Sequence, residues 1–206
     1  MAIRPILELP NPVLRQRAKK IRRIDSKVLR LAHDMVDTLQ EANGVGLAAN
    51  QVGELRRLIV IHLPEEDEFR IYINPEIVQR DGEREVEEGC LSIPGYRAMI
   101  KRSVWVRFNA MDHTEQVVKF KAEDILSQAL EHEVDHLNGI LYIDHMEAHQ
   151  KLIPVESNDE EDHEAAEEGN KLEAKAESGP SDSSRSTDLC TPGDDPRETP
   201  ASLKML

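Results

Sequence analysis

The sequence predicts an α+β fold in which antiparallel or mixed strands pack around one central helix. Two segments, residues 26–43 and 123–138, carry apolar residues at helical spacing. Between them lie shorter segments rich in β-branched residues and bounded by turn signals, as is typical of strands. From residue 155 onward apolar residues are scarce, and Ser, Pro, Glu, Asp and Gly dominate. We therefore expect one folded domain, residues 1–154, followed by an acidic disordered tail, residues 155–206.

Most of the net negative charge of the chain lies in this tail. The 206 residues include 40 acidic and 26 basic ones, which gives a formal net charge of −14. The tail alone holds 15 acidic and 5 basic residues. A segment of this composition cannot bury enough apolar surface to offset an ordering entropy of roughly 1–2 kcal/mol per residue.

The cysteines and the start of the chain bear on its compartment. Cys90 and Cys190 do not make a disulfide scaffold. The first residues are interrupted by Pro5, Pro10 and Pro12, unlike a signal peptide. No apolar run approaches the ~20 residues of a membrane span. We expect a cytoplasmic protein with no membrane partner.

The first helix is expected to begin near Asp25 or Ser26, which are both good N-caps. It is expected to end at Asn43-Gly44, with Gly44 in the left-handed conformation. The next residues, 44–51, are small and glycine-rich, so their backbone can approach a ligand or another strand closely.

The sequence between the helices predicts strands joined by turns. The expected strands are residues 58–63, 70–74, 77–79, 103–110 and 116–122. Residues 87–95 are expected to form a loop, because Gly and Pro bound them. Residues 141–143 are expected to form a short closing strand or turn.

The second helix contains His132-Glu133-Val134-Asp135-His136, an H-E-x-x-H sequence. Residues four apart lie on the same helical face, so both imidazoles could bind one metal ion. Glu133 then falls where it can reach a water on that metal. The alternative is a polar helix face with two histidines. A Lewis-acid metal beside a carboxylate favours a hydrolase of amide-type carbonyls.

A site of this kind needs a third protein ligand. The candidates are Cys90, His113, Asp144, His145, Glu147 and His149. A zinc endopeptidase built on the same helix would use His145 or His149 and would not need Cys90. A lone cysteine is more often a small buried hydrophobe, so the residues alone leave the third ligand open.

Three separated segments make the interpretation specific. They are Gly44-Val45-Gly46-Leu47-Ala48-Ala49-Asn50-Gln51, Glu88-Gly89-Cys90-Leu91-Ser92 and the H-E-x-x-H sequence. In order and spacing the chain resembles the bacterial-type peptide deformylase family over about residues 1–150. The resemblance implies removal of the N-formyl group from the N-terminal formylmethionine of newly made polypeptides, with release of formate.

The resemblance also implies roles for individual residues. Cys90, His132 and His136 would be the metal ligands, and Glu133 would be the general acid/base. The oxyanion would be stabilised by the Gln51 side-chain amide and the Leu91 backbone N–H. Among the implied substrate-binding residues, Val45, Gly46 and Gly89 would line the peptide cleft. Ala129 would form a wall of the methionine side-chain pocket, and Arg97 would lie near the path of the peptide.

The resemblance implies one divalent metal ion per chain, with Fe(II) first and Zn(II), Ni(II) or Co(II) compatible with the same donors. The implied partners are N-formylmethionyl nascent peptides and, transiently, the ribosome, with no specific nucleic acid. Family members often dock on the ribosome through a basic C-terminal helix. The tail here is acidic and would be repelled by RNA phosphates, so docking through it is not expected.

One residue departs from the family pattern beside the metal motif. The family usually has glutamine before the H-E pair, where this chain has Glu131. This carboxylate could be solvated and without effect. It could instead add negative charge near the site and raise the basicity of the metal-bound water.

Overall fold

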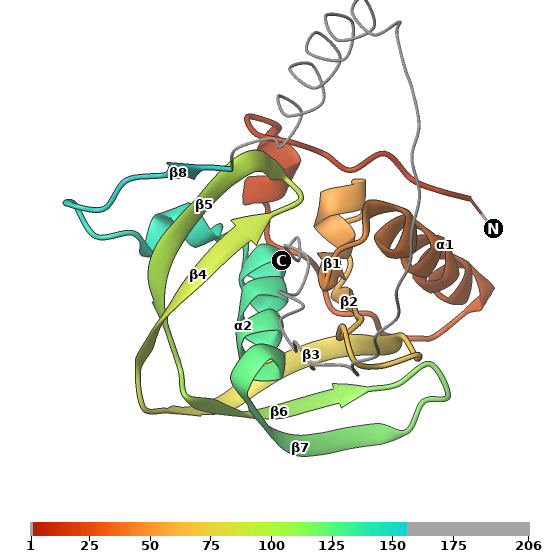
Figure 1. Cartoon of the computed structure of the whole chain (residues 1–206). Helices are drawn as coiled ribbons and strands as arrows, with labels where there is room; N and C mark the ends of the chain where they lie inside the picture. The colour runs from red at the N-terminus through yellow and green to blue at the C-terminus, as the bar shows by residue number, and fades with distance from the viewer. Residues whose placement is uncertain (1, 156–206) are drawn as a thin grey trace, which may run out of the picture. The chain divides into compact units, whose positions relative to one another are not determined.

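The computed structural model describes residues 2–155, which form two β-sheets and two α-helices (Figure 1). The helices are η1 (Pro12–Arg15), α1 (Ser26–Ala42), η2 (Ala49–Val52), α2 (Asp124–Asn138) and η3 (Tyr142–His145), where η denotes a 3₁₀ helix. The strands are β1 (Gly46–Ala48), β2 (Leu58–Ile61), β3 (Arg70–Asp81), β4 (Arg84–Cys90), β5 (Ile93–Arg102), β6 (Trp105–Met111), β7 (Val117–Glu123) and β8 (Ile153–Pro154).

Both sheets are antiparallel throughout their named strands. The larger sheet has the order β1-β2-β3-β6-β7, and the smaller one has the order β4-β5-β8. The predicted α+β class is therefore confirmed. The helix α2 contacts β1, β2, β3, β6 and β7 of the larger sheet (Figure 1).

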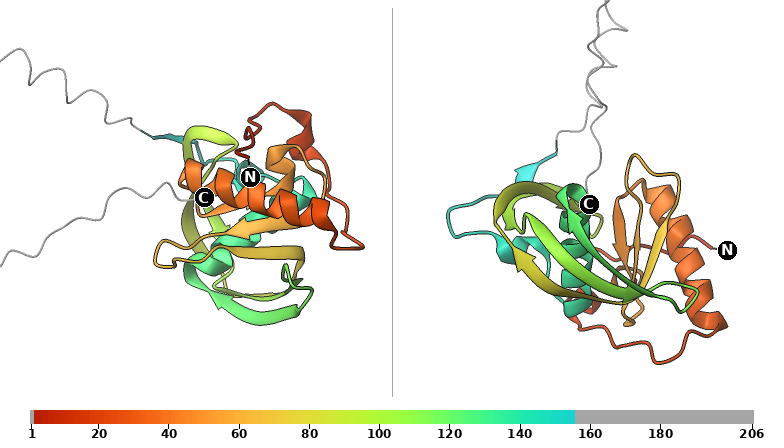
Figure 2. Two further views of the ribbon diagram at one scale, coloured as in Figure 1. Left: turned by 90° about the vertical axis from the view of Figure 1, so that its right-hand side faces the viewer. Right: turned by 90° about the horizontal axis from the view of Figure 1, so that it is seen from below.

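The larger sheet is covered by a different helix on each face (Figure 2). Ile59 and Ile61 of β2 belong to the core cluster that contains α2 residues, whereas Leu58 and Val60 belong to the cluster that contains α1 residues. Side chains of a strand alternate between the two faces, so β2 is buried along its whole length. This packing places α2 against β1 and β2.

The helix α1 begins as predicted but ends one residue earlier than expected. Asp25 is the N-cap, and its Oδ1 accepts hydrogen bonds from the N–H groups of Lys27 and Val28, both at 3.0 Å. At the other end Asn43, not Gly44, has the left-handed conformation, with φ of 51°. Asparagine tolerates this region better than most non-glycine residues, so it can serve as the cap.

The prediction of a loop over residues 87–95 was wrong. These residues belong to β4 and β5, apart from Leu91 and Ser92, which lie between the two strands. The pairing of Arg84 with Arg102 and of Glu88 with Ala98 stabilises this hairpin. Its strand character comes from cross-strand pairing, because the sequence of β4 is mostly charged.

Two smaller differences concern β3 and the end of the domain. Residues 70–74 and 77–79, expected as separate strands, form the single strand β3 with register shifts at two places. Residues 141–143, expected as a short strand or turn, form no strand: Leu141 is the N-cap of the 3₁₀ helix η3, and Tyr142 and Ile143 belong to it. Val155 donates its N–H to Gly95 O at 2.9 Å and so pairs with the body. The rest of the predicted tail lies outside the described residues.

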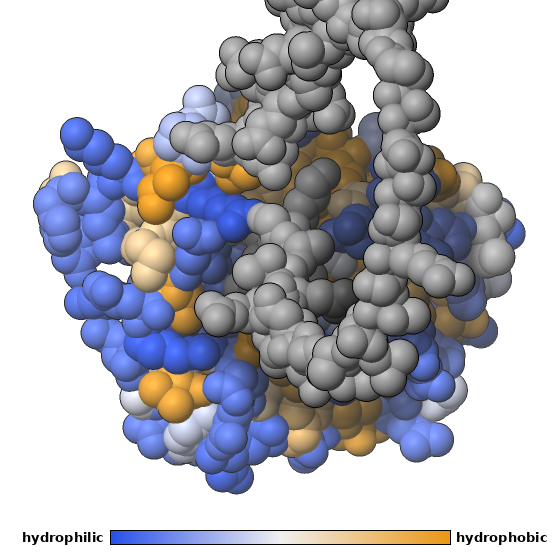
Figure 3. All heavy atoms as spheres, in the orientation of Figure 1, coloured by the Kyte–Doolittle hydropathy of each residue, from blue (hydrophilic) through white to orange (hydrophobic). Residues whose placement is uncertain are grey.

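The surface of the described residues mixes apolar and hydrophilic side chains (Figure 3). Tyr96 and Met99 on β5 and Ile153 on β8 are among the exposed large apolar residues. Within residues 2–155, neither α-helix combines the length and the apolar character needed to cross a membrane.

Candidate active site

Three potential metal ligands converge between β4 and α2. Cys90, His132 and His136 are buried, and their ligand atoms all lie within 4.8 Å of one another. The Sγ atom of Cys90 is 3.2 Å from His136 Nε2. This is the only such group of three among the described residues.

The local structure explains how these residues meet. His132 and His136 lie one turn apart on α2, so they share the face turned to β4. The ladder between β4 and β5 shifts register between Gly89 and Cys90. The N–H of Ser92, just past this irregularity, donates to Cys90 Sγ at 3.4 Å.

A buried carboxylate orients His132 from behind. His132 Nδ1 lies 2.8 Å from Glu88 Oε2, and Arg102 donates to both oxygens of Glu88 at 2.7 and 3.0 Å. Burial alone would raise the pKa of Glu88, but the bonds from His132 and Arg102 lower it to about 2. A metal-binding histidine usually donates its other ring N–H to such a group.

Sequence reasoning missed the roles of Glu88 and Arg102. Glu88 stands in the second motif, two residues before Cys90, which places both on one strand face. That spacing was the available signal. The sequence offered no such signal for Arg102, because its contact with Glu88 depends on the pairing of β5 with β4.

The alternative third ligands lie elsewhere. His145 Nε2 is 2.8 Å from Asp135 Oδ2, and the His149 side chain is 77% exposed. The remaining candidates are also engaged or exposed: Asp144 pairs with Arg15, Glu147 pairs with Lys101, and His113 is exposed. The endopeptidase arrangement that would use His145 or His149 is therefore not supported.

Glu133 is buried beside the three potential ligands. Only 1% of the residue is exposed, and its Oε2 has no hydrogen-bond partner among the described residues. Burial raises the pKa of this carboxyl to about 7. A carboxyl with a pKa near neutrality can both accept and release a proton at working pH.

Gln51 presents its amide to the same group. Its Oε1 accepts the N–H of Ala48 at 2.7 Å, which fixes the orientation of the amide. Its Nε2 then lies 3.2 Å from Ser92 Oγ and 3.7 Å from Cys90 Sγ. Leu91 is partly buried between β4 and β5, next to Cys90 in the chain.

The five residues predicted to line a peptide cleft have different surroundings. Val45, Gly46, Gly89 and Ala129 are buried. Gly46 packs on Glu133, because a Cβ at this position would meet Glu133 Oε1 at 2.4 Å. Arg97 on β5 is partly exposed, and its Nη1 donates to Glu87 Oε1 at 2.8 Å.

Glu131 is not solvated, contrary to the first of the two interpretations. It is 4% exposed. Its carboxylate accepts hydrogen bonds from Arg80 Nε at 2.9 Å and from the N–H and Oγ of Ser103 at 2.9 and 3.0 Å. The negative charge is therefore compensated locally, at the position next to the potential ligand His132.

The donor set fits a divalent transition metal. One thiolate and two imidazoles are the soft and intermediate donors that iron, zinc, cobalt and nickel accept. Glu133 Oε2, buried and without a partner among the described residues, lies beside them. Three protein ligands leave an open position, which is the arrangement of a catalytic rather than a structural site.

This fold and site define a metal-dependent hydrolase. The family model described as polypeptide deformylase matches residues 3–152. The chain therefore belongs to the polypeptide deformylase family, which hydrolyses the N-formyl group of new polypeptides.

Individual relatives agree with this assignment. The chain is 48% identical over 160 residues to the peptide deformylase of Dehalococcoides mccartyi strain CBDB1. The aligned region covers 78% of this chain and 96% of that protein. It is 43% identical over 173 residues to the peptide deformylase of Thermomicrobium roseum, covering 81% of this chain and 98% of that protein.

Solved structures show the same fold. The peptide deformylase of Legionella pneumophila superposes with a TM-score of 0.69 at 42% identity, over 71% of this chain and 88% of that one. The peptide deformylase of Synechococcus elongatus in complex with actinonin superposes with a TM-score of 0.67 at 38% identity. The match covers 70% of this chain and 79% of that one.

Proposed function

We propose that Cys90, His132 and His136 hold one divalent metal ion and that Glu133 moves the proton when this enzyme deformylates a peptide. The observation that carries the proposal is the convergence of the three donors within 4.8 Å, beside a buried carboxyl. A bound metal ion supplies Lewis acidity, which polarises a carbonyl and makes water more acidic. We name Fe(II) first, on the family resemblance, with Zn(II), Ni(II) and Co(II) as alternatives that the same donors accept.

The residues around the donors transfer the proton, stabilise the oxyanion and position the histidine ligand. Glu133 takes a proton from the attacking water and later delivers it to the departing amine. The Gln51 amide and the Leu91 N–H stabilise the oxyanion, and one such donor is typically worth ~3–4 kcal/mol. Glu88 positions His132 and is itself oriented by Arg102.

We propose that the peptide cleft adjoins the metal site. Val45, Gly46 and Gly89 would form the wall nearest the reacting carbonyl, and Ala129 would contact the methionine side chain. Arg97, which is partly exposed on β5, would lie near the path of the peptide.

We also propose that residues 1–154 form the catalytic domain and that the enzyme works in the cytoplasm. Every proposed site residue falls in this range, and the family model ends at residue 152. The substrates are N-formylmethionyl nascent peptides, so a transient association with the ribosome would bring enzyme and substrate together without a specific nucleic-acid site.

The test is formate release from formyl-Met-Ala-Ser by anaerobically purified protein, combined with metal analysis. Glu133→Ala is expected to keep the metal and to lower kcat by ~10²-fold or more, which is the scale of general acid–base catalysis. Glu85→Ala removes an exposed carboxylate on β4 and serves as the control, with unchanged kcat. Near-normal turnover of Glu133→Ala would remove Glu133 from the mechanism.

A further inference from the structure

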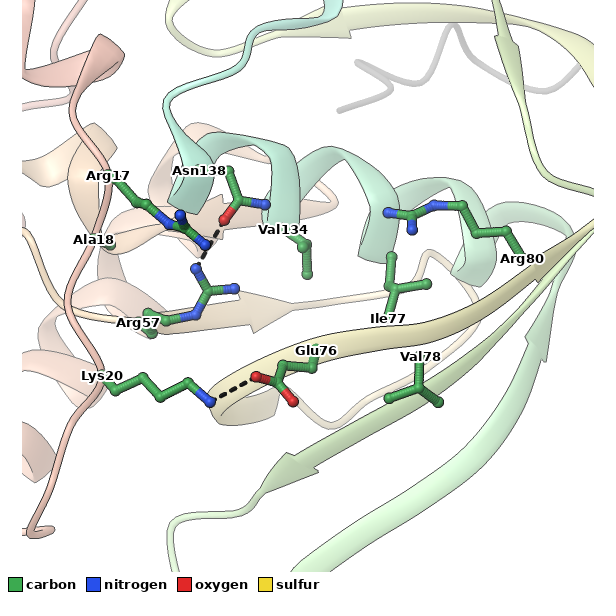
Figure 4. Close-up of a pocket in the computed structure, with 10 residues that line it drawn as sticks. All are labelled: Arg17, Ala18, Lys20, Arg57, Glu76, Ile77, Val78, Arg80, Val134 and Asn138. Atoms are coloured by element: carbon green, nitrogen blue, oxygen red, sulfur yellow. Dashed lines mark hydrogen bonds and ion pairs between the residues drawn. The ribbon is translucent and has the colours of Figure 1, made fainter.

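A cavity lies on the side of α2 turned away from the proposed metal ligands. Its volume is about 380 Å³, and Val134 and Asn138 of α2 line it (Figure 4). Val134 lies about 200° around the helix from both His132 and His136, so this cavity and the metal site occupy different faces. Its remaining lining comes from β3, from Arg57 and from the segment before α1.

The lining of this cavity is strongly basic. It contains four cations, Arg17, Lys20, Arg57 and Arg80, and one carboxylate, Glu76. Lys20 Nζ pairs with Glu76 Oε1 at 2.6 Å, and Arg80 Nε pairs with Glu131 Oε1 at 2.9 Å. Within residues 2–155, neither Arg17 nor Arg57 makes an ion pair with a carboxylate.

Arg57 is built into the fold and still has donor capacity. It is 6% exposed, and its Nη1 and Nη2 donate to Asn138 Oδ1 and Pro75 O, both at 2.9 Å. Its Nε is buried and has no hydrogen-bond partner in the described part of the chain. A guanidinium has five N–H donors, so the single hydrogen bonds made by Nη1 and by Nη2 leave one further N–H on each for a ligand in the cavity.

Arg17 adds a second guanidinium at the same end of the cavity (Figure 4). Burial, and then the positive charge of Arg17, lower the pKa of Arg57, and the carboxylate of Glu76 offsets only part of this effect. The two guanidinium groups repel each other, and an oxyanion bound between them would offset this repulsion. Arginine is the side chain best matched to phosphate, because its planar fork donates parallel hydrogen bonds.

We propose that this cavity binds the phosphate group of a small phosphomonoester, with Arg57 and Arg17 as its donors. The two positive charges without a carboxylate partner match a phosphate dianion. Ile77 and Val134 supply an apolar wall, and the volume exceeds that of a phosphate group alone. A nucleic-acid backbone is less well matched, because the principal donor, Arg57, is almost fully buried.

Phosphate titration of the zinc-loaded full-length chain tests this proposal. Inorganic phosphate and glycerol phosphate are added at constant ionic strength, with chloride as the reference, and amide resonances are followed. Saturable shifts are expected at Ala18, Lys20 and Val78, and glycerol phosphate is expected to bind more tightly. Equal affinity would identify free phosphate as the ligand of the same site. Absence of saturable shifts with both compounds would overturn the proposal.

Arg17→Gln is the decisive variant, because Arg17 is exposed and its loss should not disturb folding. It is expected to weaken binding at least about tenfold, the effect of losing one charge-assisted hydrogen bond, while Arg17→Lys recovers part of the affinity. Deformylation should stay unchanged, which separates this site from the metal site. Arg23→Gln, on the same segment but outside the cavity, is the matched control.

The control also decides between a small ligand and nucleic acid. Equal weakening by Arg17→Gln and Arg23→Gln would indicate nonspecific attraction and would overturn the proposal. A short single-stranded RNA that binds more tightly than glycerol phosphate, and that depends equally on Arg17 and Arg23, would assign the surface to nucleic acid instead.

Discussion

Gly46 lies against Glu133 so closely that a Cβ at position 46 would meet Glu133 Oε1 at 2.4 Å. Both residues are buried, and Gly46 is the first residue of β1, which packs beside α2. The first motif therefore needs glycine here because the carboxylate occupies the space of a side chain. This relationship links the first motif to the third.

Gly46→Ala should displace Glu133 and lower kcat by about tenfold or more, because a small misplacement of a catalytic group is costly. Metal content should stay at the wild-type level, since Gly46 offers no ligand. Gly95→Ala is the control, because no atom lies within 4 Å of the Cβ it would add, although its φ of +78° brings some strain. Unchanged kcat in Gly46→Ala would show that the carboxylate can shift without loss.

The second prediction concerns the third ligand. Cys90→Ala should lose tight metal binding and nearly all activity, because it removes one of three donors. His149→Ala, at an exposed position, should keep both. His145→Ala should keep the metal as well, since its ring contacts Asp135. Metal analysis of the three purified variants is the measurement, and retention of metal in Cys90→Ala would contradict the assignment.

A third prediction follows from the pKa of Glu133, which burial raises from 4.5 to about 7. In the metal-free protein the folded state then holds the proton more tightly than the unfolded state. Folding stability should therefore fall as the pH rises from about 4.5 to 7, by on the order of 3 kcal/mol. Glu133→Gln cannot titrate and should lack this loss.

Urea unfolding of the chelated wild type and of Glu133→Gln between pH 5 and pH 8 measures the difference. The variant should gain stability relative to the wild type with increasing pH, and the gain should level off above about pH 7. Taking the difference between the two proteins removes the titration of His136 and other shared groups. Two parallel stability profiles would contradict the raised pKa.

Much of this site could be predicted from sequence because its signals are local. The spacing of His132 and His136 and the N-cap at Asp25 depend on neighbours in the chain, and the structure bears both out. The hairpin of β4 and β5 could not be predicted in this way. Its first strand is mostly charged, and its partner supplies Arg102, which neutralises the buried Glu88.

Glu131 illustrates the same limit of local reasoning. Its sequence position next to His132 suggested either a solvated group or an influence on the metal. The contacts that decide the matter come from Arg80 on β3 and from Ser103, between β5 and β6. Such partners are 28 and 51 residues away in the chain, so only the fold brings them together.

Glu131→Gln should therefore destabilise the protein more than it affects catalysis. A neutral amide has only one acceptor oxygen, and its NH₂ group would face donors from Arg80 or Ser103. The expected loss is about 1–3 kcal/mol in the free energy of unfolding, with kcat within about twofold of wild type. Glu85→Gln, at an exposed position, is the control for denaturant unfolding. A tenfold fall in kcat at unchanged stability would mean that the charge of Glu131 acts on the metal site.

The last prediction concerns the domain boundary. The family model ends at residue 152, Val155 still pairs with Gly95, and every proposed site residue precedes them. A chain truncated after Val155 should therefore fold, bind metal and deformylate formyl-Met-Ala-Ser at an unchanged rate. A large loss of activity or of thermal stability would show that residues 156–206 contribute to the body.

The charge of the removed segment predicts a further difference in the presence of ribosomes. Residues 155–206 carry 15 acidic and 5 basic residues, so they should oppose attraction to RNA phosphates. Truncation should strengthen co-sedimentation with ribosomes at low salt, and added salt should abolish the difference because it screens exposed charges. Weaker co-sedimentation after truncation would identify the acidic segment itself as a docking element, in spite of its charge.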